Sequence, residues 1–121
     1  MKRLPCFVLL QILAFMLVAG GAARAQSALE SDAMAGAVLF RDKGCAQCHG
    51  KGGVGTDKAP SLVNLWQDKV WTGEKITNQI LNGGQKMPPF ADSLTDPEIA
   101  QIVAYLRSKT KPVPPPAPAA N

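Results

Sequence analysis

One short motif constrains this chain more than any other feature of its sequence. Residues 45–49 read Cys-Ala-Gln-Cys-His, the C-x-x-C-H pattern to which haem is attached in c-type proteins. In that chemistry the thiols of Cys45 and Cys48 add to the two vinyl groups of the haem. The imidazole of His49, the only histidine in the chain, then lies beside the iron. The motif predicts one haem c, attached covalently through Cys45 and Cys48, with His49 as an iron ligand.

Other uses of two closely spaced cysteines fit less well. A disulfide between them would close a loop too short to restrict the unfolded chain. A redox-active pair is expected beside a βαβ pattern, and no strand-like run lies nearby. A zinc site needs four ligands, and two thiolates with one imidazole leave the fourth place to a carboxylate, which is an uncommon set. Haem attachment is therefore the preferred interpretation.

The first residues are typical of an export signal. Lys2 and Arg3 precede an apolar run over residues 7–20, and Ala-Arg-Ala follows at 23–25. This predicts a signal peptide over residues 1–25 and a periplasmic protein. The alternative is an uncleaved membrane anchor, but the run is shorter than the roughly 20 residues that span a bilayer. After cleavage no membrane span is expected.

Most of the basic character belongs to this signal. The whole chain has 13 basic and 9 acidic residues and a net charge of +4. Cleavage removes Lys2, Arg3 and Arg24 but no acidic residue, so the remaining 96 residues carry about +1. A nucleic-acid partner is therefore not expected, and the length suits one domain.

The rest of the chain predicts an all-α domain over residues 26–111. Helices are expected over 32–43, with Ser31 as the cap, over 73–82, and from Thr95 to about Lys109. Between the first two, residues 50–65 are rich in glycine and without periodicity, which predicts an Ω-like loop.

The last helix has the clearest pattern. Thr95 and Glu98 can form a capping box, with a proline in the first turn. Its apolar positions recur at helical spacing, as do two in the helix before it: Ile99, Ile102, Val103 and Leu106, and Ile76 and Ile80. Residues 112–121 are rich in proline and alanine and predict an extended, disordered tail.

Met87 is the candidate for the second axial ligand of the iron. With no second histidine, ligation by two histidines of this chain is excluded. Met34 lies on the attachment side, whereas Met87 lies in a proline-stiffened loop that can cover the opposite face of the haem. Two alternatives stay open: Met87 as an ordinary core residue, and an open or water-ligated iron.

Taken together, the residues resemble the class I cytochromes c, specifically the small monohaem bacterial members. The likeness covers residues 32–110. It rests on the haem motif near the start and on these further positions: Gly36, Phe40, Ala59-Pro60-Ser61-Leu62, Met87-Pro88 and Ala104-Tyr105-Leu106.

The resemblance implies a fold of three to four short helices and Ω-like loops wrapped around one haem. It implies that Gly36 meets the last helix near Ile102 and Tyr105, and that the carbonyl of Pro60 accepts a hydrogen bond from His49. Trp66 and Trp71 each have two possible roles. The indole N–H could donate a hydrogen bond to a haem propionate, or the ring could simply pack in the core.

The implied function is one-electron transfer between redox proteins, by a monomer or a subunit of a larger complex, and not enzyme catalysis. Electrons would pass at the exposed haem edge, around which Lys43, Lys51 and Lys86 are expected. The alternatives are a dedicated cytochrome subunit of a dehydrogenase or oxidase, and a haem protein with an open site that senses gas or reduces peroxide.

Overall fold

The computed structural model describes residues 6–119, and every regular element among them is a helix. The elements are α1 (Cys6–Asp42), α2 (Cys45–His49), a 3₁₀ turn η1 (Lys51–Gly53), α3 (Gly73–Asn82) and α4 (Asp96–Arg107). No strand occurs in this range, so the predicted all-α class is confirmed. Lys2 and Arg3, the charged start of the predicted signal, lie outside the described residues.

The predicted start of the first helix is wrong. Residues up to Glu30 form one compact unit and residues from Ser31 form another, but α1 runs through this boundary without a break. Ser31 is therefore inside the helix and does not cap it. The reason is local, because residues 22–37 are rich in alanine, the strongest helix former, and contain no proline to stop the helix. Among the helices that the structure describes, none is both long enough and apolar enough to cross a membrane.

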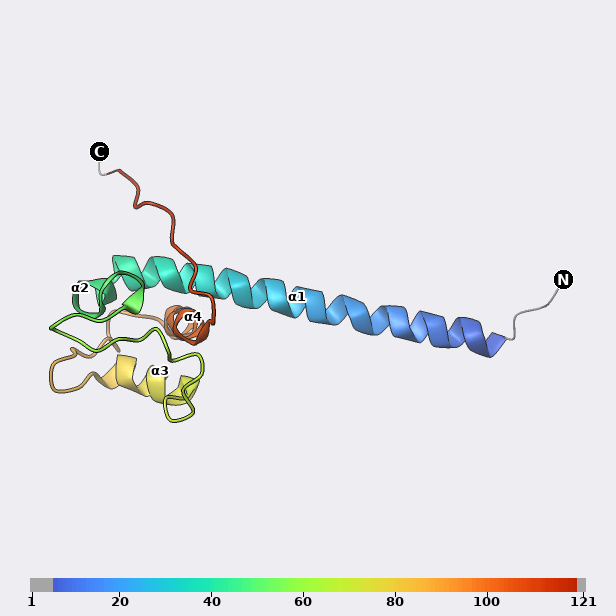
Figure 1. Cartoon of the computed structure of the whole chain (residues 1–121), viewed down its shortest axis with the longest axis horizontal. Coiled ribbons are helices and arrows are strands. Elements are labelled where there is room, and N and C mark those ends of the chain that lie inside the picture. The colour runs from blue at the N-terminus through green and yellow to red at the C-terminus, as the bar shows by residue number, and fades with distance from the viewer. Residues whose placement is uncertain (1–5, 120–121) are drawn as a thin grey trace. The chain divides into compact units, whose positions relative to one another are not determined.

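The core of the second unit lies where α4 packs between α3 and the end of α1 (Figure 1). Helix α4 gives it Ile99, Ile102, Tyr105 and Leu106, each no more than 4% exposed. The remaining buried apolar members are Ala37, Phe40, Ile76, Ile80 and Leu94. The apolar faces predicted for the two later helices are therefore the faces that pack together.

Helices α1 and α4 cross so closely at Gly36 that no side chain fits there. A Cβ atom on Gly36 would lie 1.9 Å from the backbone oxygen of Gln101 and 2.8 Å from the Cβ atom of Tyr105. The close approach implied by the sequence resemblance is confirmed, with Gln101 and Tyr105 as the residues met on α4.

The ends of the two later helices follow their sequence signals. Thr95 and Glu98 form the predicted capping box, with N–H to oxygen distances of 2.8 and 3.4 Å. Glu98 also pairs with Lys43 at 3.1 Å, which ties the residue after α1 to the start of α4. Thr72 caps the start of α3, and the helix ends at Asn82, directly before Gly83, as the pair Gly83-Gly84 predicted. Helix α4 stops at Arg107 instead of near Lys109, because Ser108 is extended.

Beyond α4 the described chain has no regular secondary structure, but two contacts attach it to the helices. The ammonium group of Lys111 donates to the carbonyls of Tyr105 and Leu106 at 3.2 and 2.9 Å, and the Tyr105 carbonyl also accepts from the N–H of Ser108 at 3.2 Å. These bonds satisfy carbonyls that the last turn of α4 leaves without helical partners. Farther on, Arg41 donates to the carbonyl of Pro115.

We expect Gly36→Ala to destabilise the folded domain by roughly 3 kcal/mol or more, because the added methyl group overlaps backbone atoms that cannot move independently. Gly73→Ala is the matched control. Its Cβ atom would lie 3.4 Å from the end of Val103, an ordinary contact, and alanine favours the helix. Denaturant unfolding of the two variants measures the difference. Equal stability would contradict the crossing.

Candidate functional site

The predicted site residues line one cavity of about 920 Å³. Cys45, Cys48, His49, Pro60 and Met87 all contribute to its lining. The structure thus brings together residues from α2, from the loop that follows it and from the segment after α3.

Helix α2 presents the haem motif directly after α1. The turn between the two helices depends on Gly44, whose φ of 85° lies in the left-handed region that favours glycine. Cys45 is half-buried and Cys48 is exposed. Burial raises the pKa of the Cys45 thiol, with a smaller contribution of the same sign from neighbouring Cys48. In the unloaded chain Cys45 is therefore kept in its thiol form.

The imidazole of His49 is held by a backbone carbonyl. Its Nδ1 atom lies 2.9 Å from the oxygen of Pro60, so the hydrogen bond that the resemblance implies is present. A carbonyl oxygen can only accept, which requires the proton to be on Nδ1. The other ring nitrogen, Nε2, is then left with its lone pair, the form in which histidine binds a metal.

The loop that carries Pro60 is folded back onto α2. Backbone bonds join Gly55 to His49 at 2.7 Å and Leu62 to Gly53 at 2.7 Å. Thr56 adds a side-chain link: its hydroxyl donates to the carbonyl of Cys48 and accepts from the N–H of Lys58 at 3.0 Å. Thr56 was not among the residues predicted for the site. The only local signal was a threonine at the start of a turn, a position where its hydroxyl often bonds the backbone two residues on.

The segment that carries Met87 is fixed to the end of α3. The N–H of Gly84 donates to the carbonyl of Met87 at 2.8 Å, and the N–H of Phe90 donates to that of Ile80 at 3.0 Å. Gly83 makes this possible. With φ at 68°, its missing Cβ atom would lie 2.4 Å from the carbonyl oxygen of Met87. The sequence predicted Gly83 only as a helix stop.

Of the other residues expected near the haem, some line the cavity and some do not. Trp71 lines it, whereas Trp66 is not in its lining, and both are half-buried. Lys43 and Lys86 also line it, but Lys43 is paired with Glu98 and is not a free cation. Lys51 lies outside the lining. Met34 lies on α1, exposed by 39%.

The residues present fit a haem. The cavity lies within the ~300–1,000 Å³ range of cofactor pockets, and it combines apolar walls with a few polar groups. Two thiols at the required spacing, an imidazole with a fixed tautomer and a thioether in the same lining are the kinds of donor that a c-type haem with histidine and methionine ligands would use.

Comparison with known proteins gives the same answer. Residues 31–106 match the family model described as cytochrome C oxidase, cbb3-type, subunit III. The cytochrome c6 of Rippkaea orientalis is 32% identical over 113 residues, which cover 92% of this chain and 96% of that protein. The cytochrome c6 of a Nostoc species is also 32% identical, over 90% of this chain and 95% of its own length.

The cbb3-type cytochrome c oxidase subunit FixP of Sinorhizobium medicae is 37% identical over 89 residues, 64% of this chain but only 30% of FixP. This chain therefore corresponds to less than a third of that subunit. No solved structure matches it. The chain belongs to the cytochrome c family: it is a small class I monohaem cytochrome, an electron carrier that binds one haem c covalently through Cys45 and Cys48.

Proposed function

We propose that this cytochrome carries single electrons in the periplasm, with His49 and Met87 as the axial ligands of its iron. The observation that carries the proposal is the placement of these two side chains. They come from segments far apart in sequence, they line the same cavity, and each segment is fixed by backbone hydrogen bonds.

When bound, the haem supplies the one-electron chemistry by changing between its ferrous and ferric forms. The chain's own residues hold the ligands ready for both forms. Pro60 keeps the proton of His49 on Nδ1 and, by accepting that bond, makes the imidazole a better donor. Gly83 and Gly84 hold the backbone of Met87, so the thioether does not have to be reorganised at each transfer. A thioether ligand also raises the reduction potential.

We propose that residues 1–25 are a signal removed on export, that residues 26–111 are the functional domain and that residues 112–121 are a tail outside that domain. The charged start, the apolar run and the Ala-Arg-Ala sequence support export. Export to the periplasm also suits a chain whose cysteines carry haem.

A free carrier is supported by the likeness to the cytochrome c6 proteins. This chain spans nearly the whole of the cytochrome c6 proteins, whereas it spans under a third of FixP. The family model, described as an oxidase subunit, supports the second candidate: a cytochrome that stays bound to a larger redox complex. Copurification with a membrane complex would favour that candidate over the free carrier.

The proposed ligation predicts a spectrum. The ferric holoprotein should show the weak far-red band of sulfur-to-iron charge transfer, and Met87→Ala should abolish it because the thioether is removed. Met34→Ala, a methionine outside the cavity lining, should leave the band unchanged. A high-spin wild-type spectrum that shifts readily with cyanide would instead indicate an open site and support the sensor or peroxidase-like alternative.

Gly83→Ala should disturb Met87 without altering its side chain. The new methyl group overlaps the Met87 carbonyl, and a residue other than glycine at the φ of 68° and ψ of −159° found here costs roughly 1–3 kcal/mol. We expect a weaker far-red band and lower stability. In Gly84→Ala the added atom meets only the amide end of Gln79, which would have to shift from its hydrogen bond to the Gly83 carbonyl, so we expect a small loss of stability and an unchanged band. A Gly83→Ala protein with an unchanged band would show that Met87 does not depend on this glycine.

Thr56→Val should loosen the loop that carries Pro60. The substitution keeps the shape of the side chain but removes two hydrogen bonds, each worth about 0.5–1.5 kcal/mol. Because the Pro60 carbonyl would then hold His49 less firmly, the imidazole becomes a weaker donor and the reduction potential should rise. Thr56→Ser keeps the hydroxyl and should resemble the wild type. Voltammetry and denaturant unfolding measure both effects, and identical potentials would exclude this link.

A further inference from the structure

A cluster of lysine and tryptophan side chains lies where segment 65–71 meets the end of α4. One guanidinium nitrogen of Arg107 on α4 donates to three carbonyls of this segment, those of Leu65, Asp68 and Trp71, at 2.6, 2.9 and 3.0 Å. Because the three oxygens share one donor atom, the segment is wrapped around the end of the helix. Near the middle of this segment, Lys69 and Val70 are exposed.

Two lysines from other elements lie over the tryptophans of this segment. The ammonium nitrogen of Lys75, on α3, is 4.7 Å from the ring centre of Trp71. That of Lys109, just after α4, is 5.5 Å from the ring centre of Trp66. Such contacts are typical of cation–π pairs. We call this surface the Lys–Trp patch; it consists of Trp66, Lys69, Val70, Trp71, Lys75 and Lys109.

The positive charge of the patch is not neutralised by ion pairs. The ion pairs found among the described residues are Arg41–Asp42 and Lys43–Glu98, and neither involves the patch. Asp68 lies within the segment, but its carboxylate is occupied by the N–H groups of Val70 and Trp71 at 2.8 and 3.0 Å. These hydrogen bonds lower the pKa of Asp68, with smaller contributions from Arg107 and Lys75. Glu74 directly precedes Lys75 in the chain. The three lysines and Arg107 still outnumber these two carboxylates.

We propose that the Lys–Trp patch is a docking surface for an acidic face of a partner protein. Its composition is that of an interface, with aromatic groups and the 66% exposed Val70 among cationic groups. A lipid surface fits less well, because both tryptophans are half-buried with lysines over their rings, which leaves Val70 as the one large apolar side chain available for insertion.

The patch also adjoins the haem cavity, since Leu65, Asp68 and Trp71 line it. A partner bound here would lie against a wall of the cavity and would leave the segments of Cys48 and Met87 free for a second partner. The identification of the partner bound at the Lys–Trp patch as a redox protein rests on the proposed function. The existence of the surface does not.

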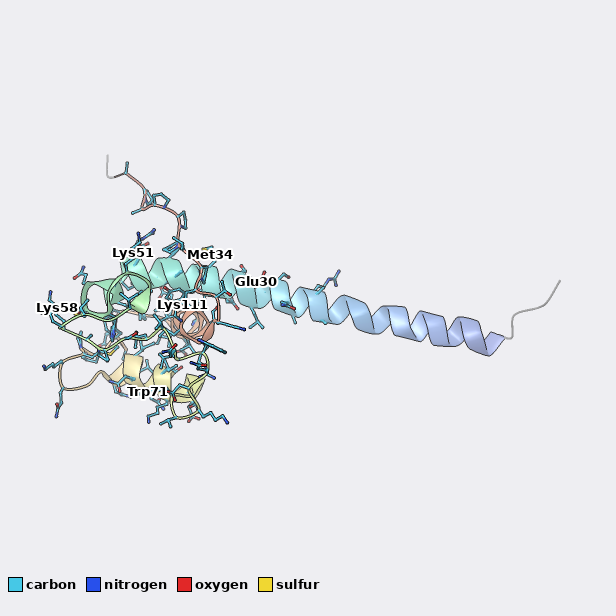
Figure 2. All side chains as sticks on the ribbon, viewed as in Figure 1. Glu30, Met34, Lys51, Lys58, Trp71 and Lys111 are labelled. Atoms are coloured by element: carbon cyan, nitrogen blue, oxygen red, sulfur yellow. The ribbon has the colours of Figure 1, made fainter. Side chains whose placement is uncertain are left out.

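The test is an NMR titration of the reduced holoprotein with poly-L-glutamate as the acidic probe, at low salt. Amide shifts should concentrate in residues 65–75 and 107–109, and they should fade when salt screens the charges. Lys75→Glu/Lys109→Glu should weaken binding by roughly tenfold. The matched variant Lys51→Glu/Lys58→Glu makes the same change of charge on the segment beside α2 (Figure 2) and should weaken it less than about twofold.

Larger shifts around Lys51 and Lys58, or a greater loss in that matched variant, would overturn the proposal. So would patch-dependent binding to phosphatidylglycerol vesicles without binding to poly-L-glutamate, which would identify a lipid surface. Lys75→Gln/Lys109→Gln removes the charges without reversing them, and it decides the question if the reversed variant does not fold. The far-red spectrum separates the two proposals: shifts at the patch in a protein without the band would leave the docking surface standing and remove the proposed ligation.

Discussion

The contact between the backbones of α1 and α4 at Gly36 is the constraint on which the rest of the domain depends. It fixes the end of α1, and the haem motif begins within a few residues of that end. The ion pair between Lys43 and Glu98 also joins the end of α1 to α4, at the first turn of α4. Because α3 packs on α4, and the Met87 segment is bonded to the end of α3, both sides of the cavity are positioned relative to one helix.

Much of this arrangement could be predicted from local signals. Helices α3 and α4 were predicted because their apolar residues recur at helical spacing and their caps are encoded within a few residues, as in the Thr95–Glu98 box. The haem motif is likewise local, since its chemistry requires adjacent residues. The contact between His49 and Pro60 was available only through resemblance to a family, because nothing in the spacing of two residues across a loop specifies a hydrogen bond.

The features that the sequence did not predict depend on contacts between distant segments, or on competition between a capping preference and the helix propensity of the neighbouring residues. Ser31 is a good cap in isolation, but the alanine-rich sequence on both sides favours a continuous helix. Arg107 had no distinguishing signal, because its three acceptors are backbone carbonyls, which every residue has. Thr56 and Gly83 could be assigned only general turn roles until the residues opposite them were known.

The residues that line the cavity are spread along the chain, and the attachment motif comes near the start of this series. The attachment motif is complete once the chain has been made as far as His49, whereas Pro60, Met87 and Leu106 follow later. Because the chain is made from its N-terminus, both thiols and the imidazole exist before the residues that complete the wall of the cavity.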